Sequence, residues 1–204
     1  MKLKSTLLLI LFIIISNISA QSKVKNSGYL SIHGGAYTVL SENYDKYYES
    51  KFGTIFGLSL GVPVSSRINL FAKLSYFENE SIPTSDLTND KTKTSVLKQL
   101  LFNSGIQYKI LNASRVNLYL QTGLTAAIID EERKDEIGAF TYEIEGNGNF
   151  GIFAGGIIEI NLWNSPVSIL GEFNYVYSWS PLLEYDETFK AINFVVGLRY
   201  YLAR

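Results

Sequence analysis

The feature that most constrains this chain is a two-residue alternation over Ala191–Leu202, which reads AINFVVGLRYYL. The even-numbered positions are apolar or aromatic, whereas the odd-numbered positions include asparagine, glycine and arginine. A period of two predicts a β-strand with one apolar face. The length matches the roughly 9–11 tilted residues with which a strand crosses a bilayer. We therefore expect a membrane-spanning strand at the C-terminal end of the sequence.

Seven earlier segments repeat this alternation, and we expect the eight strands to close into an antiparallel up-and-down transmembrane barrel. Two residues, Lys98 and Ser104, interrupt the apolar face of the fourth segment. Lys98 fits either the level of the lipid headgroups or a β-bulge that shifts the register. The seven segments are Gly28–Val39, Phe52–Val62, Arg67–Phe77, Val96–Ile110, Val116–Ile129, Phe150–Leu162 (with a start as early as Thr141) and Val167–Trp179.

The connections between these segments alternate between long and short. Long polar connections follow the first, third, fifth and seventh strands, and they include Glu78–Thr94 and the charged run Asp130–Glu136. Short turns follow the second, fourth and sixth strands, at Pro63–Ser66, Leu111–Arg115 and Trp163–Pro166. Transmembrane barrels have short periplasmic turns and longer external loops. The pattern therefore predicts both termini in the periplasm.

The N-terminal segment has the composition of a secretory signal. Lys2 and Lys4 precede the apolar run Leu7–Ile15, and small or polar residues follow as far as Ala20. The run is shorter than the ~20 apolar residues that a spanning helix needs. We expect a cleaved signal peptide over residues 1–20 and a single barrel domain over residues 21–204.

Alternation alone does not decide which face of the barrel is outside, since a soluble lipocalin-like barrel is apolar inside. Here the polar face is rich in small residues such as Gly53, Gly57 and Gly151, and it carries few lysines and glutamates. The interior of an eight-stranded barrel is just wide enough for side chains to fill it. We therefore expect the polar face inside and the apolar face towards lipid. Aromatic residues at the strand ends fit the two interfacial girdles of such barrels: Tyr76, Tyr108, Trp163, Tyr175, Tyr177, Trp179 and Tyr200.

The signal, the eight alternating strands and the aromatic terminal strand resemble the small outer-membrane β-barrel proteins of Gram-negative bacteria, the OmpA/OmpX-like group. The resemblance covers the whole mature chain. It implies a bacterial outer-membrane location, contact with outer-membrane lipid and lipopolysaccharide, and recognition by the barrel-insertion machinery. That family usually ends in an aromatic residue, whereas this chain ends Tyr201-Leu202-Ala203-Arg204.

The composition offers little material for catalysis, cofactors or metals. The chain has no cysteine, one histidine and a formal charge of −1, so nothing points to disulfides, thiolate metal sites or nucleic acid. His33 with nearby Ser31 suggests a lipid hydrolase, but no second histidine is available and we expect a hydrogen-bonded lumen residue instead. The acidic run Asp130–Glu136 offers carboxylates for divalent cations between lipopolysaccharide headgroups, but it lacks EF-hand spacing and favours a solvated loop. We expect no catalytic, cofactor or metal residues.

Two sets of residues are candidates for a structural or binding role. Four charges share the inward parity and fall at similar heights, which predicts a network of two cations and two carboxylates across the lumen: Lys73, Glu159, Glu172 and Arg199. Three tyrosines in the first long loop provide rigid contact area for a surface partner, or extend the outer aromatic belt: Tyr44, Tyr47 and Tyr48.

These expectations favour a monomeric, non-enzymatic outer-membrane barrel with a filled lumen that acts structurally or binds an unknown surface ligand or protein through four external loops. The first alternative is a narrow porin-like channel, which a filled lumen disfavours. The second is an outer-membrane enzyme that acts on lipid, which the missing triad disfavours.

Overall fold

The computed structural model describes residues 27–40, 50–81, 92–135, 141–145, 148–163, 165–179 and 188–202. The predicted signal peptide lies outside these residues. No helix in the described part of the chain is long and apolar enough to cross a membrane. The strands are β1 (Tyr29–Val39), β2 (Phe52–Pro63), β3 (Ile68–Ser81), β4 (Thr92–Asn112), β5 (Val116–Asp135), β6 (Thr141–Glu145), β7 (Asn149–Asn161), β8 (Val167–Ser178) and β9 (Phe189–Tyr201).

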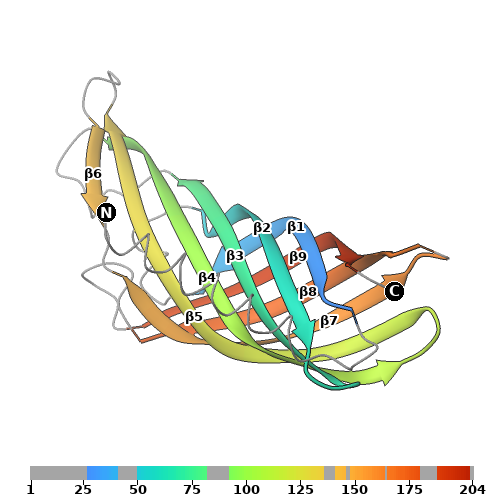
Figure 1. Ribbon diagram of the computed structural model, residues 1–204. Helices are drawn as coiled ribbons and strands as arrows, with labels where there is room; N and C mark the ends of the chain where they lie inside the picture. Colours follow the sequence, from blue (N-terminus) through green and yellow to red (C-terminus); the bar gives the residue numbers. More distant parts are fainter. Residues whose placement is uncertain are drawn as a thin grey trace.

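The strands form one antiparallel sheet that closes on itself. Their order is β4-β3-β2-β1-β9-β8-β7-β5-β6, and β4 also pairs with β5. Strand β6 pairs with β5 only over Asp130–Lys134, beyond the part of β5 that pairs with β7. The other strands therefore make up an eight-stranded up-and-down barrel (Figure 1), and the predicted fold class is confirmed. The sixth predicted segment is two pieces, β6 and β7, in line along the same side of β5.

The two faces of the wall are sorted as the alternation predicts. On β9 the outward Val196 is 66% exposed, whereas its neighbour Val195 is 3% exposed and faces the lumen. The outward face of the barrel therefore consists largely of apolar side chains, whereas the polar residues face the lumen together with a cluster of buried apolar residues. The exposed apolar residues include Leu30, Ile32, Phe56, Leu58, Leu74, Leu100, Leu120, Leu124, Ile152, Phe173, Phe194 and Leu198.

Strands β4 and β5 are longer than the sequence pattern predicted. They contain 21 and 20 residues, against 11 and 12 for β1 and β2. The expected loops Glu78–Thr94 and Asp130–Glu136 are therefore partly wrong, since β3 runs to Ser81, β4 begins at Thr92 and β5 continues to Asp135. A polar segment can remain a strand when each side of its backbone has a partner, and β5 lies between β4 and β6 here. Figure 1 shows β4, β5 and β6 reaching past the other strands at one end of the barrel.

The bulge considered near Lys98 is absent from the β4–β5 pairing. Its register is continuous from Thr94 to Lys109, and the irregularities lie at Thr92/Thr94 and Lys109/Leu111. Lys98 stays on the outward face and donates a hydrogen bond to Glu132 Oε2 at 2.7 Å. The interruption in the apolar pattern therefore marks the place where the apolar outward surface of β4 ends. It does not mark a change of register.

The inward face of β2 consists largely of small residues because larger side chains from β1 lie over it. Tyr29 is registered opposite Gly61, and a Cβ at Gly61 would overlap the Tyr29 ring. His33 is registered opposite Gly57 in the same way. These glycines therefore serve close side-chain packing inside a narrow barrel.

Candidate functional site in the barrel lumen

The lumen near the short-turn end contains an enclosed ion pair between Arg199 and Glu159. Arg199 Nη1 donates to Glu159 Oε2 at 3.1 Å, and the two side chains are 1% and 0% exposed. The Tyr201 hydroxyl donates to the other carboxylate oxygen at 2.5 Å. The guanidinium also lies over the Tyr29 ring, 3.9 Å from its centroid, and donates to Ser31 Oγ at 3.3 Å. These hydrogen bonds offset the free-energy cost of removing the two charges from water.

A second buried ion pair lies further along the lumen. Lys73 from β3 donates to Glu172 from β8, across the barrel. Two amides also donate to the Glu172 carboxylate, Gln121 Nε2 at 2.8 Å and the side chain of Asn174. Gln107 and Tyr29 extend this group, because the Tyr29 hydroxyl donates to Gln107 Oε1 at 2.8 Å and Gln107 donates to Gln121.

The four charges that share the inward parity are thus arranged as two separate ion pairs. The register sets Glu159 opposite Leu170 and Glu172 opposite Ile157. Each carboxylate has its own cation, so the mutual repulsion of these diagonal neighbours is offset within each pair. Tyr29 joins the two groups, since its ring contacts Arg199 and its hydroxyl begins the chain that leads to Glu172.

An apolar layer, which the sequence reasoning missed, lies on the long-strand side of the ion pairs. Tyr37 and Phe77 have ring centroids 4.2 Å apart, and Phe189 stacks on Tyr37 at 6.4 Å. All three side chains are buried, together with Ile55, Val176 and Ala191. The odd-numbered residues of β1, β3 and β9 face the lumen. The alternation along these strands was therefore the signal in the sequence that could have identified the apolar layer.

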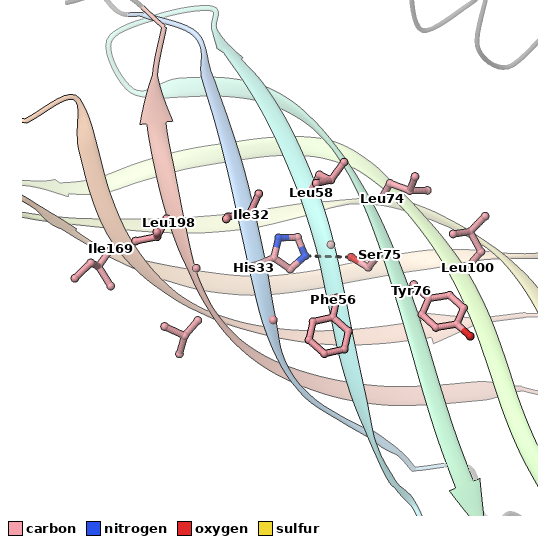
Figure 2. Close-up of a pocket in the computed structure, with 14 residues that line it drawn as sticks. Ile32, His33, Phe56, Leu58, Leu74, Ser75, Tyr76, Leu100, Ile169 and Leu198 are labelled. Atoms are coloured by element: carbon pink, nitrogen blue, oxygen red, sulfur yellow. Dashed lines mark hydrogen bonds between the residues drawn. The ribbon is translucent and has the colours of Figure 1, made fainter.

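His33 contacts a serine on another strand and not the serine beside it in sequence. Figure 2 shows its ring reaching across β2 to Ser75 of β3, with 3.2 Å between Nε2 and Oγ. Ser31 instead accepts from Arg199. The outward side chains labelled in the same view, such as Ile32, Phe56 and Leu58, line an apolar groove of about 790 Å³ on the barrel surface.

Most side chains of the acidic run, and all three loop tyrosines, lie outside the part of the chain that the structure describes. No group of three or more histidine, cysteine, aspartate or glutamate residues in that part of the chain could hold a metal ion. Tyr44, Tyr47 and Tyr48 lie outside the described residues.

The short-turn rim carries arginines stacked on or bonded to outward aromatic residues. The Arg115 guanidinium lies 3.7 Å from the centroid of the Trp163 ring, which is 79% exposed. Arg67 Nη1 donates to the Tyr108 hydroxyl at 3.4 Å. Such combinations of cation and amphipathic ring suit the headgroup level of a bilayer.

Solved structures of bacterial outer-membrane proteins have the same fold. Neisserial surface protein A matches with a TM-score of 0.57 at 12% identity, over 86% of this chain and 97% of that one. Ail, the attachment invasion locus protein of Yersinia pestis, matches with 0.55 at 13% identity, over 87% and 99%. OprG from Pseudomonas aeruginosa matches with 0.58 at 15% identity, over 88% and 98%. This chain therefore has the architecture of the small eight-stranded outer-membrane barrels.

No family model matches the chain. No curated protein matches it by sequence either.

Proposed function

We propose that this chain is a non-enzymatic barrel of the bacterial outer membrane that acts at the cell surface through its external loops, with its lumen closed by side chains. The observation that carries this proposal is the exposed apolar surface of a closed barrel whose buried polar residues face inward. Exposure of this apolar surface to water would cost free energy. In a bilayer, the same side chains contact the apolar acyl chains of the lipid. Closure also satisfies the backbone of every wall strand within the sheet.

The interior supports a closed lumen in preference to a channel. The two ion pairs lie in it near the short-turn end, and the layer around Tyr37, Phe77 and Phe189 occupies it further out. The interior of an eight-stranded barrel has little space beyond such side chains. A closed barrel offers its outer end for binding, which favours surface interaction over transport.

The extended part of β4, β5 and β6 supports a role for the outer end. It continues beyond the apolar surface and carries charged residues, among them the outward pair Lys98–Glu132. A neighbour in fold offers one ligand class for a first test, since Ail was solved in complex with the heparin analogue sucrose octasulfate. We propose sulfated polysaccharide as the first ligand to screen, alongside other surface proteins.

The location is tested by fractionating cells that express the full-length protein. We expect the protein in the outer-membrane fraction, resistant to extraction by high salt and released by detergent. Recovery from a soluble periplasmic pool would overturn the proposal.

The surface role is tested separately by capture experiments with the intact barrel and with a barrel whose external loops are shortened. We expect a ligand that binds the first and not the second. Equal capture by both barrels would place the binding surface elsewhere.

A further inference from the structure

The charged side chains at the short-turn end of the barrel are mostly cations. This end, where the β4–β5 and β7–β8 turns lie, is opposite to β6 (Figure 1). Arg67, Lys109 and Arg115 belong to it, and none of the three forms an ion pair within the part of the chain that the structure describes. The acid that the described strands contribute here, Glu159, is enclosed with Arg199. The outer rim at this end is therefore positively charged.

Arg115 is held in this rim by the neighbouring turn. The backbone N–H of Asn161 donates to the Arg115 carbonyl oxygen at 2.8 Å, so the start of β5 lies beside the end of β7. The Arg115 guanidinium then stacks on the exposed Trp163 ring. Stacking uses the face of a guanidinium and leaves the N–H groups at its edge available to an anion. That planar edge matches two oxygens of a phosphate group.

An apolar groove of about 580 Å³ lies further along the outward faces of the same strands. Its lining includes two glycines on the neighbouring strands β7 and β8. A Cβ at Gly156 would have a carbonyl oxygen at 3.6 Å as its nearest contact, so the outer surface is hollowed there. Apolar residues of β5, β7 and β8 surround the two glycines: Leu118, Leu120, Gly156, Ile158, Gly171 and Phe173.

The groove lies at a depth that a lipid acyl chain reaches from the rim. Leu120 is registered opposite Gly156 and is five positions from Arg115. At about 3.3 Å per residue and a strand tilt of about 45°, Gly156 lies roughly 12 Å below the level of Arg115. Half of the hydrocarbon core is about 15 Å thick. A lipid whose headgroup contacts Arg115 therefore reaches Gly156 within its own leaflet.

We propose that Arg115, Trp163 and the groove at Gly156 and Gly171 form a binding site for one anionic glycerophospholipid. The phosphate accepts hydrogen bonds from the Arg115 guanidinium, and one acyl chain fills the groove. A second copy of this chain fits the face less well, because it would bring its own cationic rim to the same level of the bilayer. The inference rests on the membrane location proposed above.

The two tryptophans of the chain allow the site to be compared with the other end of the barrel. Trp163 belongs to the proposed site, and Trp179 lies at the far end of β8. The full-length barrel is inserted into phosphatidylcholine vesicles that contain rising fractions of brominated phosphatidylglycerol or of brominated phosphatidylcholine. In the Trp179→Phe variant, we expect fluorescence quenching to show an apparent affinity about fivefold higher for phosphatidylglycerol. In the Trp163→Phe variant, Trp179 should show no such preference.

A matched pair of charge variants separates a local site from general attraction to the rim. In the Trp179→Phe background, Arg115→Gln should abolish the preference, whereas Arg67→Gln, with the same change of charge, should retain it. Equal loss in both variants, or no preference before substitution, would overturn the proposal. Failure of the unsubstituted barrel to insert would overturn the proposed function as well, whereas insertion without a preference overturns this inference alone.

A second measurement tests the groove and does not depend on the tryptophans. Native mass spectrometry of the full-length barrel in detergent, with added phosphatidylglycerol, measures the fraction that retains one lipid. Gly156→Leu fills the groove and should lower this fraction to that of Arg115→Gln. The matched control Ala72→Leu, on the outward face of β3, should leave it unchanged. Unchanged retention in Gly156→Leu would overturn the proposal, as would dimers that this substitution abolishes, because the face would then bind a second copy.

Discussion

At the scale of single residues, Arg199 combines an ion pair, a hydrogen bond and an aromatic contact at one point of the lumen. Its guanidinium contacts Glu159, Ser31 and the Tyr29 ring, and its side chain is almost fully enclosed. An enclosed ion pair contributes little net stability compared with an apolar pair of the same shape, but loss of one partner leaves the other charge unpaired. The energetic role of Arg199 therefore depends on the presence of Glu159.

Removing Arg199 alone should be much more costly than removing the pair. We expect Arg199→Met to lower the free energy of unfolding by about 3–5 kcal/mol, because Glu159 is left as a buried uncompensated charge. Glu159→Gln in that background should restore part of the loss. Urea unfolding of the two single variants and the double variant measures the coupling, and additive effects would contradict the pairing.

Neighbouring valines of β9 test the two faces of the wall. Val196→Arg should cost about 2–4 kcal/mol in a bilayer, because the outward position lies in the apolar surface. The inward Val195→Arg should instead disrupt packing in the lumen, and its cost should be the same in bilayers of different thickness. The free energy of unfolding of both variants, measured in vesicles with thin and with thick bilayers, separates the two effects. An equal response at both positions would show that the faces are assigned incorrectly.

At the scale of elements, β2 shows how side-chain size is matched between neighbouring strands. Its inward glycines accept the Tyr29 and His33 side chains of β1. The outward Gly156 of β7 differs, since a Cβ there would meet only the Tyr119 carbonyl oxygen, at 3.6 Å. Glycine is therefore required at Gly61 and merely tolerated at Gly156.

This difference predicts opposite effects of the same substitution. Gly61→Ala should destabilise the barrel by about 1–3 kcal/mol, because its Cβ overlaps the buried Tyr29 ring. Gly156→Ala should be neutral or stabilising by up to about 1 kcal/mol, because alanine restricts the unfolded chain. Unfolding midpoints of the two variants, measured in the same detergent, decide between this account and a general intolerance of alanine.

The extension of β5 and β6 is a separable element. Asp130 and Glu145 are cross-strand partners, so residues 131–144 can be replaced by a two-residue Asn-Gly turn. The apolar surface and both lumen ion pairs remain in this variant. We expect the free energy of unfolding to change by less than about 1 kcal/mol. Failure of the shortened chain to fold in detergent would show that the extension is needed for the stability of the barrel.

At the scale of the whole molecule, the proposed closure of the lumen depends on contacts between opposite sides of the wall. The Lys73–Glu172 pair connects β3 to β8, strands that are separated by β2, β1 and β9 in the sheet. Such a pair exists only once the barrel has closed. The Arg199–Glu159 pair differs, since only β8 separates its two strands in the sheet.

Breaking the cross-barrel pair should therefore change conduction. We expect negligible steady conductance for the unmodified barrel in planar bilayers, and measurable openings for the Lys73→Met/Glu172→Gln variant, which loses both charges at once. The matched control is Lys98→Met/Glu132→Gln, which removes an ion pair from the outer surface. Steady large conductance of the unmodified barrel, or equal conductance of the two double variants, would refute closure by Lys73 and Glu172.

The sequence by itself determined the architecture and the two faces of the wall. Ala191–Leu202 has one wholly apolar face because successive side chains of a strand point to opposite sides, and this property is local to each strand. The short turns and the parity of each segment then fixed the pairing of neighbours, including Glu159 with Leu170. The two candidate cations and the two carboxylates were identifiable by the same parity.

Only the tertiary structure decided which of these groups meet. The partner of Lys73 depends on how the tilted wall closes, and no local pattern encodes that stagger. The strand over Asp130–Asp135 has no useful alternation either, and it forms because β4 and β6 provide backbone partners on both sides. Likewise, the unpartnered amides of Gln99 and Asn149 became recognisable only in the closed barrel. Contacts across the lumen are long-range, so their energies depend on closure of the whole barrel and not on any single segment.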